Sequence, residues 1–145
     1  MKALLQRVSQ ASVGVAGQQV AAIDAGLLVL LGLDKGDDIV MAERMLDKLL
    51  AYRIFADGQG KMNRSVVDVS GGVLLVSQFT LSASTSKGLR PSFSEALPPI
   101  VAEALYNDAL AMLREKHHKV AAGIFGADMQ VSLINDGPVT FLLEL

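Results

Sequence analysis

The sequence predicts an α+β protein with a mostly antiparallel, bifurcated sheet and two main helices packed on one side of it. Three observations lead to this class. Apolar segments rich in β-branched residues stand at both ends of the chain, two segments with helical spacing lie between them, and turn residues separate the elements. The order strands, helix, strand, helix, strands is typical of helices gathered on one face of an antiparallel sheet. The 145 residues fit a single domain, residues 1–145.

The N-terminal third is expected to form strands. Residues 4–15 and 20–23 are rich in β-branched residues and are separated by Gly17-Gln18-Gln19, which predicts a β-hairpin. Residues 26–33 form a continuous apolar run that contains glycine near both ends. Such a run is typical of a strand buried on both faces.

A first helix is expected to begin at Asp37 or Asp38, because a carboxylate is a good N-cap, and to run to about Arg53. Its apolar side is predicted to carry four residues at helical spacing, namely Val40, Leu46, Leu49 and Leu50. Turn signals follow at Asp57-Gly58 and Gln59-Gly60, and residues 73–77 are predicted to form a short buried strand.

A second helix is expected to open at Pro98 and Pro99, where a missing N–H group costs nothing. Its buried face is predicted to contain Val101, Leu105, Ala109 and Met112. His117 and His118 are interpreted as an exposed, cationic helix end that complements the helix dipole. Residues 130–134 and 139–145 are expected to be two closing strands.

Composition restricts the function classes. The net charge of −2 argues against a broad duplex-binding face, although it allows contact with a few phosphates. There is no Cys, which fits a reducing compartment, and no apolar run approaches the ~20 residues of a membrane span. We expect a soluble cytoplasmic protein that makes no membrane contact.

Few catalytic side chains are available. The only two His residues are adjacent, and neighbouring helical residues point about 100° apart, so a Ser-His-Asp triad is disfavoured. Acidic residues are scattered and zinc-ligand spacing is absent, so we predict no metal site and no cofactor. Gly71-Gly72 precedes a strand and does not open a helix, unlike a phosphate-binding loop.

Ser77-Gln78-Phe79-Thr80 follows the apolar run 73–76. One interpretation is an ordinary strand edge with alternating faces. The other places Gln78 and the backbone N–H groups of Phe79 and Thr80 at a cleft, where such donors can stabilise a developing oxyanion.

Asn135-Asp136-Gly137-Pro138 has the composition of a hairpin turn between the two closing strands. A cis Gly137–Pro138 peptide is the alternative, since X–Pro bonds adopt the cis form far more readily than other bonds. It would aim two carbonyl groups in one direction and form a rigid acceptor pair suited to a substrate ammonium.

Taken together, these two stretches resemble the signature motifs of the D-aminoacyl-tRNA deacylase family, and the resemblance extends over essentially the whole chain. It includes segments 25–32, 52–55, 60–63, 77–81, 90–93, 127–131 and 135–140. The resemblance implies a homodimer that hydrolyses the ester between a D-amino acid and the 3′ end of tRNA, as a proofreading hydrolase. Ser77, Gln78 and Thr80 match the family's serine–glutamine–x–threonine motif, with Phe79 as the variable member. Gly137 and Pro138 match its Gly-cis-Pro motif, which enters the partner's site, and a related L-selective group carries Gly-Thr there.

The resemblance leaves the nucleophile open. Thr80 could attack the ester, but no general base is visible beside it and an unassisted hydroxyl is weak. The ribose 2′-OH of the terminal adenosine could instead activate a water while the protein orients the ester, which is the interpretation we prefer. Met129 and Phe125 are candidates for lining the substrate pocket.

Further contacts and rival functions also follow from the residues. Lys87 and Arg90, in the polar stretch 82–96, are candidates for RNA phosphate contacts, the alternative being an ordinary solvated loop. Mischarged glycyl-tRNA is expected to be hydrolysed as well, because glycine has no handedness to reject. The main alternative function is a non-catalytic nucleic-acid-binding dimer that uses the same cleft. A small-metabolite binder at a subunit interface is a weaker third.

Overall fold

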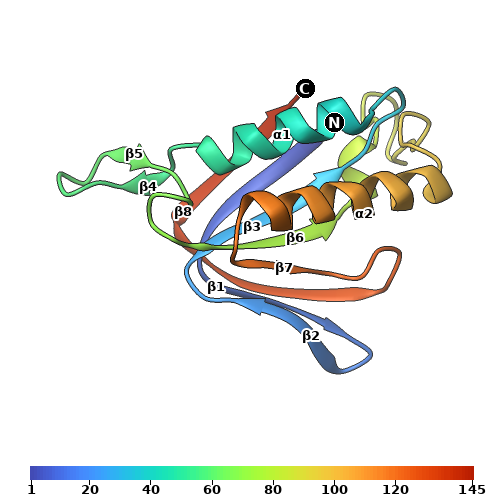
Figure 1. Ribbon diagram of the computed structural model, residues 1–145. Helices are drawn as coiled ribbons and strands as arrows, with labels where there is room; N and C mark the ends of the chain where they lie inside the picture. The colour runs from blue at the N-terminus through green and yellow to red at the C-terminus, as the bar shows by residue number, and fades with distance from the viewer.

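The computed structural model describes all 145 residues, and it contains two α-helices and eight β-strands (Figure 1). The helices are α1 (Ile39–Ala51) and α2 (Pro99–Lys116), and a short 3₁₀ helix, η1, covers Phe79–Ser82. The strands are β1 (Lys2–Val15), β2 (Gln18–Ile23), β3 (Gly26–Gly32), β4 (Phe55–Ala56), β5 (Met62–Arg64), β6 (Gly72–Ser77), β7 (Val120–Ala122) and β8 (Met129–Glu144).

The main sheet is mixed and mostly antiparallel, in the order β2-β1-β3-β6-β7, with β8 paired to β1. Strand β1 is antiparallel to β2, β3 and β8, whereas β3–β6 and β6–β7 are parallel pairs. The hairpin of β1 and β2 is confirmed, as is the α+β class. Strands β4 and β5 form a separate two-stranded sheet.

Both helices cover the same face of the sheet (Figure 1). The larger core lies under them and contains Leu27, Val29 and Leu31 of β3, while the intervening Leu28 belongs to a smaller core on the opposite face. Since successive strand residues point to opposite faces, β3 is buried on both sides, as its continuous apolar run predicts. The smaller core also holds Leu74 and Val76 of β6.

Helix α1 begins where the sequence indicates, but its buried face differs in part. The Asp38 carboxylate accepts a hydrogen bond from the Met41 N–H at 2.8 Å, which identifies Asp38 as the N-cap. Leu46, Leu49 and Leu50 are buried as predicted, whereas Val40 is exposed because it lies on the outer side of the first turn.

Helix α2 opens at Pro98 and Pro99 as expected, but it is rotated relative to the predicted face. Its buried residues are Ala102, Leu105, Tyr106, Ala109 and Leu113. Val101, predicted to be buried, is 53% exposed, and Met112 is only partly buried. Apolar residues occur on more than one side of this helix, so spacing alone could not select the face. The hydroxyl of Tyr106 donates to the Leu75 carbonyl at 3.0 Å and directs that residue into the core.

The interpretation of His117 as an exposed helix end is wrong. It is the C-cap of α2, with extended backbone angles that turn its side chain inward, and it is 4% exposed. Its Nε2 donates to the Gly71 carbonyl at 2.8 Å, just before β6 begins. A carbonyl left without a partner at the start of a buried strand would be costly, and the imidazole satisfies it.

The two closing strands are in fact one. Strand β8 pairs with β1 from Met129 opposite Val15 to Glu144 opposite Lys2, without reversing direction. The prediction of a hairpin turn at Asn135–Pro138 is therefore wrong. The register passes from Asn135 opposite Val8 to Thr140 opposite Gln6, so residues 136–139 bulge out of the ladder.

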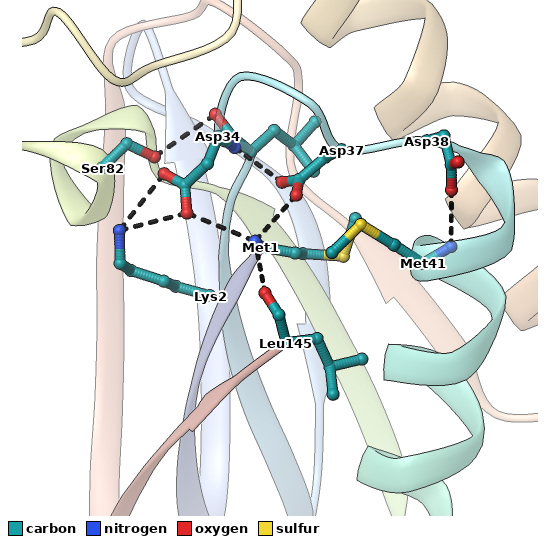
Figure 2. A network of polar contacts seen from close by, with 9 residues as sticks. Met1, Lys2, Asp34, Asp37, Asp38, Met41, Ser82 and Leu145 are labelled. Carbon is teal, nitrogen blue, oxygen red and sulfur yellow. Dashed lines mark hydrogen bonds and ion pairs between the residues drawn. The ribbon is translucent and has the colours of Figure 1, made fainter.

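A polar network holds the first residues against the turn between β3 and α1 (Figure 2). The Met1 ammonium group lies 2.8 Å from Asp37 Oδ1 and 3.2 Å from Asp34 Oδ2, and it donates to the Leu145 carbonyl at 3.1 Å. The Lys2 ammonium also bonds to the Asp34 carboxylate. Burial acts to raise the pKa of Asp34, but hydrogen bonds from Ser82 and Lys2 and the N-terminal charge together lower it.

The same network supports η1. Ser82, at the end of η1, is buried and donates to the Leu33 carbonyl at 3.3 Å, next to Asp34. The C-terminal end of η1 is thus held against the residues that follow β3. Neither α1 nor α2 has the length and apolar character needed to cross a membrane.

Candidate active site

The candidate site begins where β6 ends. Gln78 leaves the extended conformation, with φ −144° and ψ 82°, while its N–H still donates to the Leu31 carbonyl at 2.8 Å. The chain then enters η1, in which the Leu81 N–H donates to the Gln78 carbonyl at 3.2 Å. The N–H groups of Phe79 and Thr80 lie in the first turn of this helix, where they have no intrahelical partner.

The side chains of the first motif are joined by one short hydrogen bond. Gln78 Nε2 donates to Thr80 Oγ1 at 2.5 Å, which fixes the orientation of the amide. No acidic or basic side chain is a hydrogen-bond partner of the Thr80 hydroxyl. Phe79 is 60% exposed, and its ring contacts that of Phe93 with centroids 5.0 Å apart.

A cavity of about 700 Å³ opens beside these residues. It lies between the end of β6, the start of α2 and the segment that leads into β8. The residues that line it are Val76, Ser77, Gln78, Phe79, Phe93, Ala96, Leu97, Pro98, Pro99, Ala102, Phe125, Gly126, Ala127, Met129 and Val131. Apolar clefts with a few polar groups at one end are typical of small-molecule sites.

Five of the sequence-predicted residues line this cavity, namely Ser77, Gln78, Phe79, Phe125 and Met129. Thr80 is not among the lining residues but is bonded to Gln78. The lining residues that the sequence did not single out come mainly from the 93–102 segment. Their apolar character is indistinguishable from that of core residues, so only the fold brings them to the site.

None of the lining side chains titrates near neutral pH, since the set contains no Asp, Glu, His, Lys, Cys or Tyr. Tyr106 lies behind the cavity, with its ring 5.7 Å from that of Phe125, and burial raises its pKa to about 12. It is therefore a neutral hydrogen-bond donor in the core. The polar chemistry of the cavity wall is limited to hydroxyl, amide and backbone groups.

Glycine at position 123 creates the space for Met129. A Cβ atom at Gly123 would lie 2.6 Å from the Met129 sulfur, well inside van der Waals contact. The Gly123 N–H donates to the Leu75 carbonyl at 2.9 Å, so the backbone cannot move away easily. Gly123 thus determines how Met129 is seated in the cavity wall.

The second motif forms the bulge in β8, and its Gly137–Pro138 peptide bond is cis. Both residues are exposed, and neither lines the cavity of its own chain. Asn135 braces the bulge from within: its Oδ1 accepts from the Val139 N–H at 2.6 Å, and its Nδ2 donates to Thr140 Oγ1 at 2.9 Å.

Arg7 braces the bulge from β1. Its Nε donates to the Asp136 carbonyl at 2.9 Å, and its Nη1 donates to the Ile54 carbonyl at 2.7 Å. The sequence analysis missed this residue, because one arginine in a strand looks like an ordinary surface cation. The signal that could have found it is weak. Arg7 faces the larger of two irregularities in the β1–β8 ladder, and only the strand register shows this.

The two motifs lie far apart within one chain. Met129 and Val131 of β8 line the cavity, and Gly137 lies six residues beyond Val131 in the same strand. At ~3.3 Å per residue this is about 20 Å along β8. One subunit therefore does not bring Gly137 to its own cavity.

Lys87 and Arg90 lie in the exposed excursion between η1 and α2 and do not line the cavity. Mutual backbone hydrogen bonds between Ser84 and Ser92, at 2.8 and 3.0 Å, close the base of this excursion. Both cations are exposed near its tip, and neither is in an ion pair.

Comparison with known proteins gives a consistent result. The profile of the family described as D-Tyr-tRNA(Tyr) deacylase matches residues 4–144. Proteins named D-aminoacyl-tRNA deacylase from Stutzerimonas stutzeri and Pseudomonas aeruginosa are 62% and 60% identical over 144 residues, with 99% of each chain covered. The one from Saccharophagus degradans is 57% identical over 145 residues, with full coverage of both.

Two solved structures share the fold. One, named c-Myc DNA Unwinding Element Binding Protein, has a TM-score of 0.96 and 45% identity, covering 100% of this chain and 99% of its own. The other, a probable eukaryotic D-amino acid tRNA deacylase, has a TM-score of 0.83 at 18% identity, covering 99% and 98%. The match of the family profile to nearly every residue and the identity of about 60% to its members lead to one conclusion: this chain belongs to the D-Tyr-tRNA(Tyr) deacylase family.

Proposed function

We propose that this protein hydrolyses the ester bond between a D-amino acid and the 3′ end of tRNA, releasing the free D-amino acid and the tRNA. The observation that carries the proposal is membership of the deacylase family over residues 4–144. The cavity beside Ser77, Gln78 and Phe79 is large enough for an aminoacyl group, and its wall offers the polar groups that such a reaction requires. We place the reaction in the cytoplasm.

Gln78 and the N–H groups of Phe79 and Thr80 are the proposed donors for the oxyanion of the tetrahedral intermediate. The short hydrogen bond from Gln78 to Thr80 supports this role, because it preorganises the amide before substrate arrives. The N–H groups at the start of η1 are directed away from intrahelical acceptors and are available to a ligand. Ser77 provides a hydroxyl at the end of β6.

A water activated by the ribose 2′-OH of the substrate is the proposed nucleophile. The cavity wall contains no side chain that could act as a general base near neutral pH, and the Thr80 hydroxyl has only an amide as its partner. An unassisted hydroxyl is a weak nucleophile, whereas the 2′-OH adjoins the ester in every aminoacyl-tRNA. The contribution of the protein is then positioning and charge stabilisation.

The active unit is proposed to be a homodimer in which each subunit lends Gly137 and Pro138 to the other's cavity. The amino nitrogen and the ester carbon of an aminoacyl group are separated by only ~2.5 Å. Gly137 lies about 20 Å along β8 from the last residue of that strand in the cavity wall, so within one chain the two motifs cannot hold both ends of such a group. The exposure of Gly137 and Pro138 fits a role outside their own subunit.

Selection for handedness is assigned to the carbonyl groups of Gly137 and Pro138, which would bind the substrate ammonium. A hydrophobic pocket distinguishes side chains by only ~1–3 kcal/mol per methylene, so strict rejection of L-residues needs a wall of backbone. The braces from Arg7 and Asn135 make this segment stiff enough for that task. Glycine has no handedness, so glycyl-tRNA is also a proposed substrate.

Phe125 and Met129 are proposed to line the space for the substrate, and Lys87 and Arg90 to contact phosphates near the tRNA end. The alternative function, a nucleic-acid-binding dimer without catalysis, is favoured by one observation. The solved structure with 45% identity is named for binding a DNA unwinding element. The net charge of −2 disfavours a broad duplex-binding face.

The test is release of free amino acid from matched D-tyrosyl-tRNA and L-tyrosyl-tRNA by the purified protein. We expect rapid release from the D-substrate and little above the spontaneous rate from the L-substrate. The Gln78→Ala variant is the control and should lose most of the activity while still binding tRNA. If neither amino acid is released, hydrolysis is refuted and the non-catalytic binding function remains. If both are released equally, the role of Gly137 and Pro138 in selecting the D-amino acid is refuted.

A further inference from the structure

Residues 53–64, which we call the β4–β5 arm, follow α1. The base of the arm is anchored by the buried Ile54, and its β4–β5 hairpin projects away from the main sheet and both helices (Figure 1). The arm carries Arg53, Lys61 and Arg64 and a single carboxylate, Asp57, so its net charge is +2 in a chain whose net charge is −2. All three cations are exposed, and none is in an ion pair.

The one carboxylate of the arm is used within the turn. Asp57 Oδ1 accepts from the Gln59 and Lys61 N–H groups at 2.8 and 3.0 Å, and Oδ2 accepts from Asn63 Nδ2 at 2.7 Å. The nearest other acid is Asp68, whose carboxylate bonds to the N–H and hydroxyl groups of Ser65. The two acids thus stabilise local turns. Arg64 Nη2 donates to the Asp68 carbonyl at 2.7 Å, whereas Arg53 and Lys61 make no side-chain hydrogen bond within the protein and are free for an anion.

The arm is fixed to the bulge that carries Gly137 and Pro138. Arg7 donates from Nε to the Asp136 carbonyl and from Nη1 to the Ile54 carbonyl, and Ile54 directly precedes β4. One guanidinium therefore joins the bulge to the base of the arm. When Gly137 and Pro138 bind to a surface, the three cations of the β4–β5 arm are therefore brought close to that surface.

That surface is not the cavity of the same chain, because neither Gly137 nor Pro138 lines it and Gly137 lies about 20 Å along β8 from Val131 in its wall. Two further cations, Lys87 and Arg90, lie outside the cavity wall, on the excursion that leads to Phe93 in that wall. These two cations and those of the β4–β5 arm would lie around a single site when the bulge of one subunit enters the cavity of another.

We propose that the β4–β5 arm binds the phosphate backbone of the tRNA acceptor end in trans, beside the active site of the partner subunit. This inference rests on the proposed dimeric deacylase function. The partner is identified by its charge: polyanionic RNA is the ligand that a small cationic projection on an otherwise acidic protein would select. The arm and the Lys87–Arg90 excursion would then hold the acceptor end from two sides.

The first test uses the variant Arg53→Gln/Lys61→Gln, since neither side chain makes a hydrogen bond within the protein. The matched control, Arg44→Gln/Arg114→Gln, removes the same charge from exposed positions on the two helices. Wild type and both variants are compared by thermal melting, by sedimentation, and by filter binding of uncharged tRNA from about 50 to 200 mM salt.

If the arm binds phosphates, the arm variant alone should show a slope of log K against log[salt] that is shallower by roughly 1.5–2. With D-tyrosyl-tRNA its KM should rise on the order of fivefold to tenfold with little change in kcat. A slope and KM equal to those of the control would overturn the proposal. A variant that sediments as a monomer would also overturn it, because the arm would then serve subunit contact.

The second test asks whether the arm acts in trans. A heterodimer is purified through two different tags, with Gln78→Ala on one chain and the arm substitutions on the other. The only cavity that keeps Gln78 then belongs to the chain with the substituted arm. If the arm acts on the partner's site, this cavity receives the intact arm of the other chain, and the heterodimer has half the wild-type activity with a wild-type KM. A raised KM in the heterodimer would contradict action in trans.

The failure of this inference can be told from failure of the deacylase function. Filter binding needs no turnover, so the salt slope is measured whether or not the ester is cleaved. If the salt slope of tRNA binding depends on the arm but the wild-type protein releases no D-tyrosine, the hydrolysis proposal is refuted and the RNA-binding role of the arm stands. If D-tyrosine is released but neither the salt slope nor KM depends on the arm, hydrolysis stands and the role of the arm is refuted.

Discussion

Replacement of Arg7 by methionine tests whether a braced bulge is what reads the substrate. Methionine keeps much of the apolar length of the side chain but removes every donor. The Asp136 and Ile54 carbonyl groups would lose hydrogen bonds of 2.9 and 2.7 Å from a charged donor. The ion pair with Asp136 Oδ2, at 3.8 Å and with the carboxylate largely exposed, contributes little.

The magnitude follows from the environment of the two acceptors. Ile54 is buried, so its carbonyl cannot easily exchange the lost donor for water, whereas Asp136 is exposed and its carbonyl can. One unsatisfied buried acceptor and one solvent-compensated acceptor together destabilise the fold by about 2–4 kcal/mol. For a chain of this size the corresponding decrease in Tm is roughly 4–16 °C.

The effect on activity should exceed the effect on stability. If the bulge positions the substrate ammonium, its displacement by about 1 Å lowers kcat/KM for D-tyrosyl-tRNA by on the order of 100-fold. The ratio of D to L hydrolysis should fall as well. Arg7→Lys, which keeps the charge but cannot reach both carbonyls with a rigid fork, should be intermediate.

The assay is steady-state release of tyrosine from D- and L-tyrosyl-tRNA at a temperature at which every variant is folded. Leu46→Ala, in the core beneath α1, is the control for stability: it should lower Tm by a comparable amount and leave the D-to-L ratio unchanged. An Arg7→Met protein with wild-type kcat/KM and wild-type selectivity would refute the reasoning, because the bulge would then need no brace.

Three other outcomes are expected. Thr80→Ala should retain the hydrolysis rate to within about tenfold in single-turnover assays, because it removes only the hydroxyl that orients Gln78. Loss of a true nucleophile would lower the rate on the order of 10⁶-fold. Gly123→Ala should displace the flexible Met129 side chain, change stability by no more than about 1 kcal/mol in urea titrations and raise KM. An unchanged KM would remove Met129 from the site. The folded-state pKa of Asp34 is lowered, so its stabilisation is present above the unfolded pKa of ~3.9 and is lost as pH falls through the folded value. Asp34→Asn should therefore melt below wild type at pH 7 and converge with it near pH 2, and equal melting temperatures at pH 7 would contradict this.

Local chemistry determined the elements and their class. The side chains of the continuous apolar run 26–32 are removed from water only if both faces of the strand are buried, and the structure buries β3 in this way. Asp38 and Pro99 mark the starts of the two helices because capping and proline geometry act within a single turn. The polar groups of Ser77, Gln78 and Thr80 follow a buried strand, and the cavity lies beside them.

Long-range pairing decided what the sequence predicted wrongly. Asn135-Asp136-Gly137-Pro138 has the residues of a turn, but β1 offers one long edge, and pairing along it keeps β8 in a single direction. His117 looks like a solvated helix end, but the Gly71 carbonyl, 46 residues away, draws it into the core. Val101 lies on one of several apolar sides of α2, and the contact of Tyr106 with Leu75 selects another.

The sequence by itself determined the family, the class of fold and the polar residues of the candidate site, because these depend on residue type and on spacing along the chain. Only the tertiary structure decided that Arg7 joins the bulge to the β4–β5 arm and that Gly137 and Pro138 lie outside the cavity of their own chain. The physical reason is that strand register decides which residues, distant in the sequence, lie side by side and which lie far apart. No local property of the residues encodes that register.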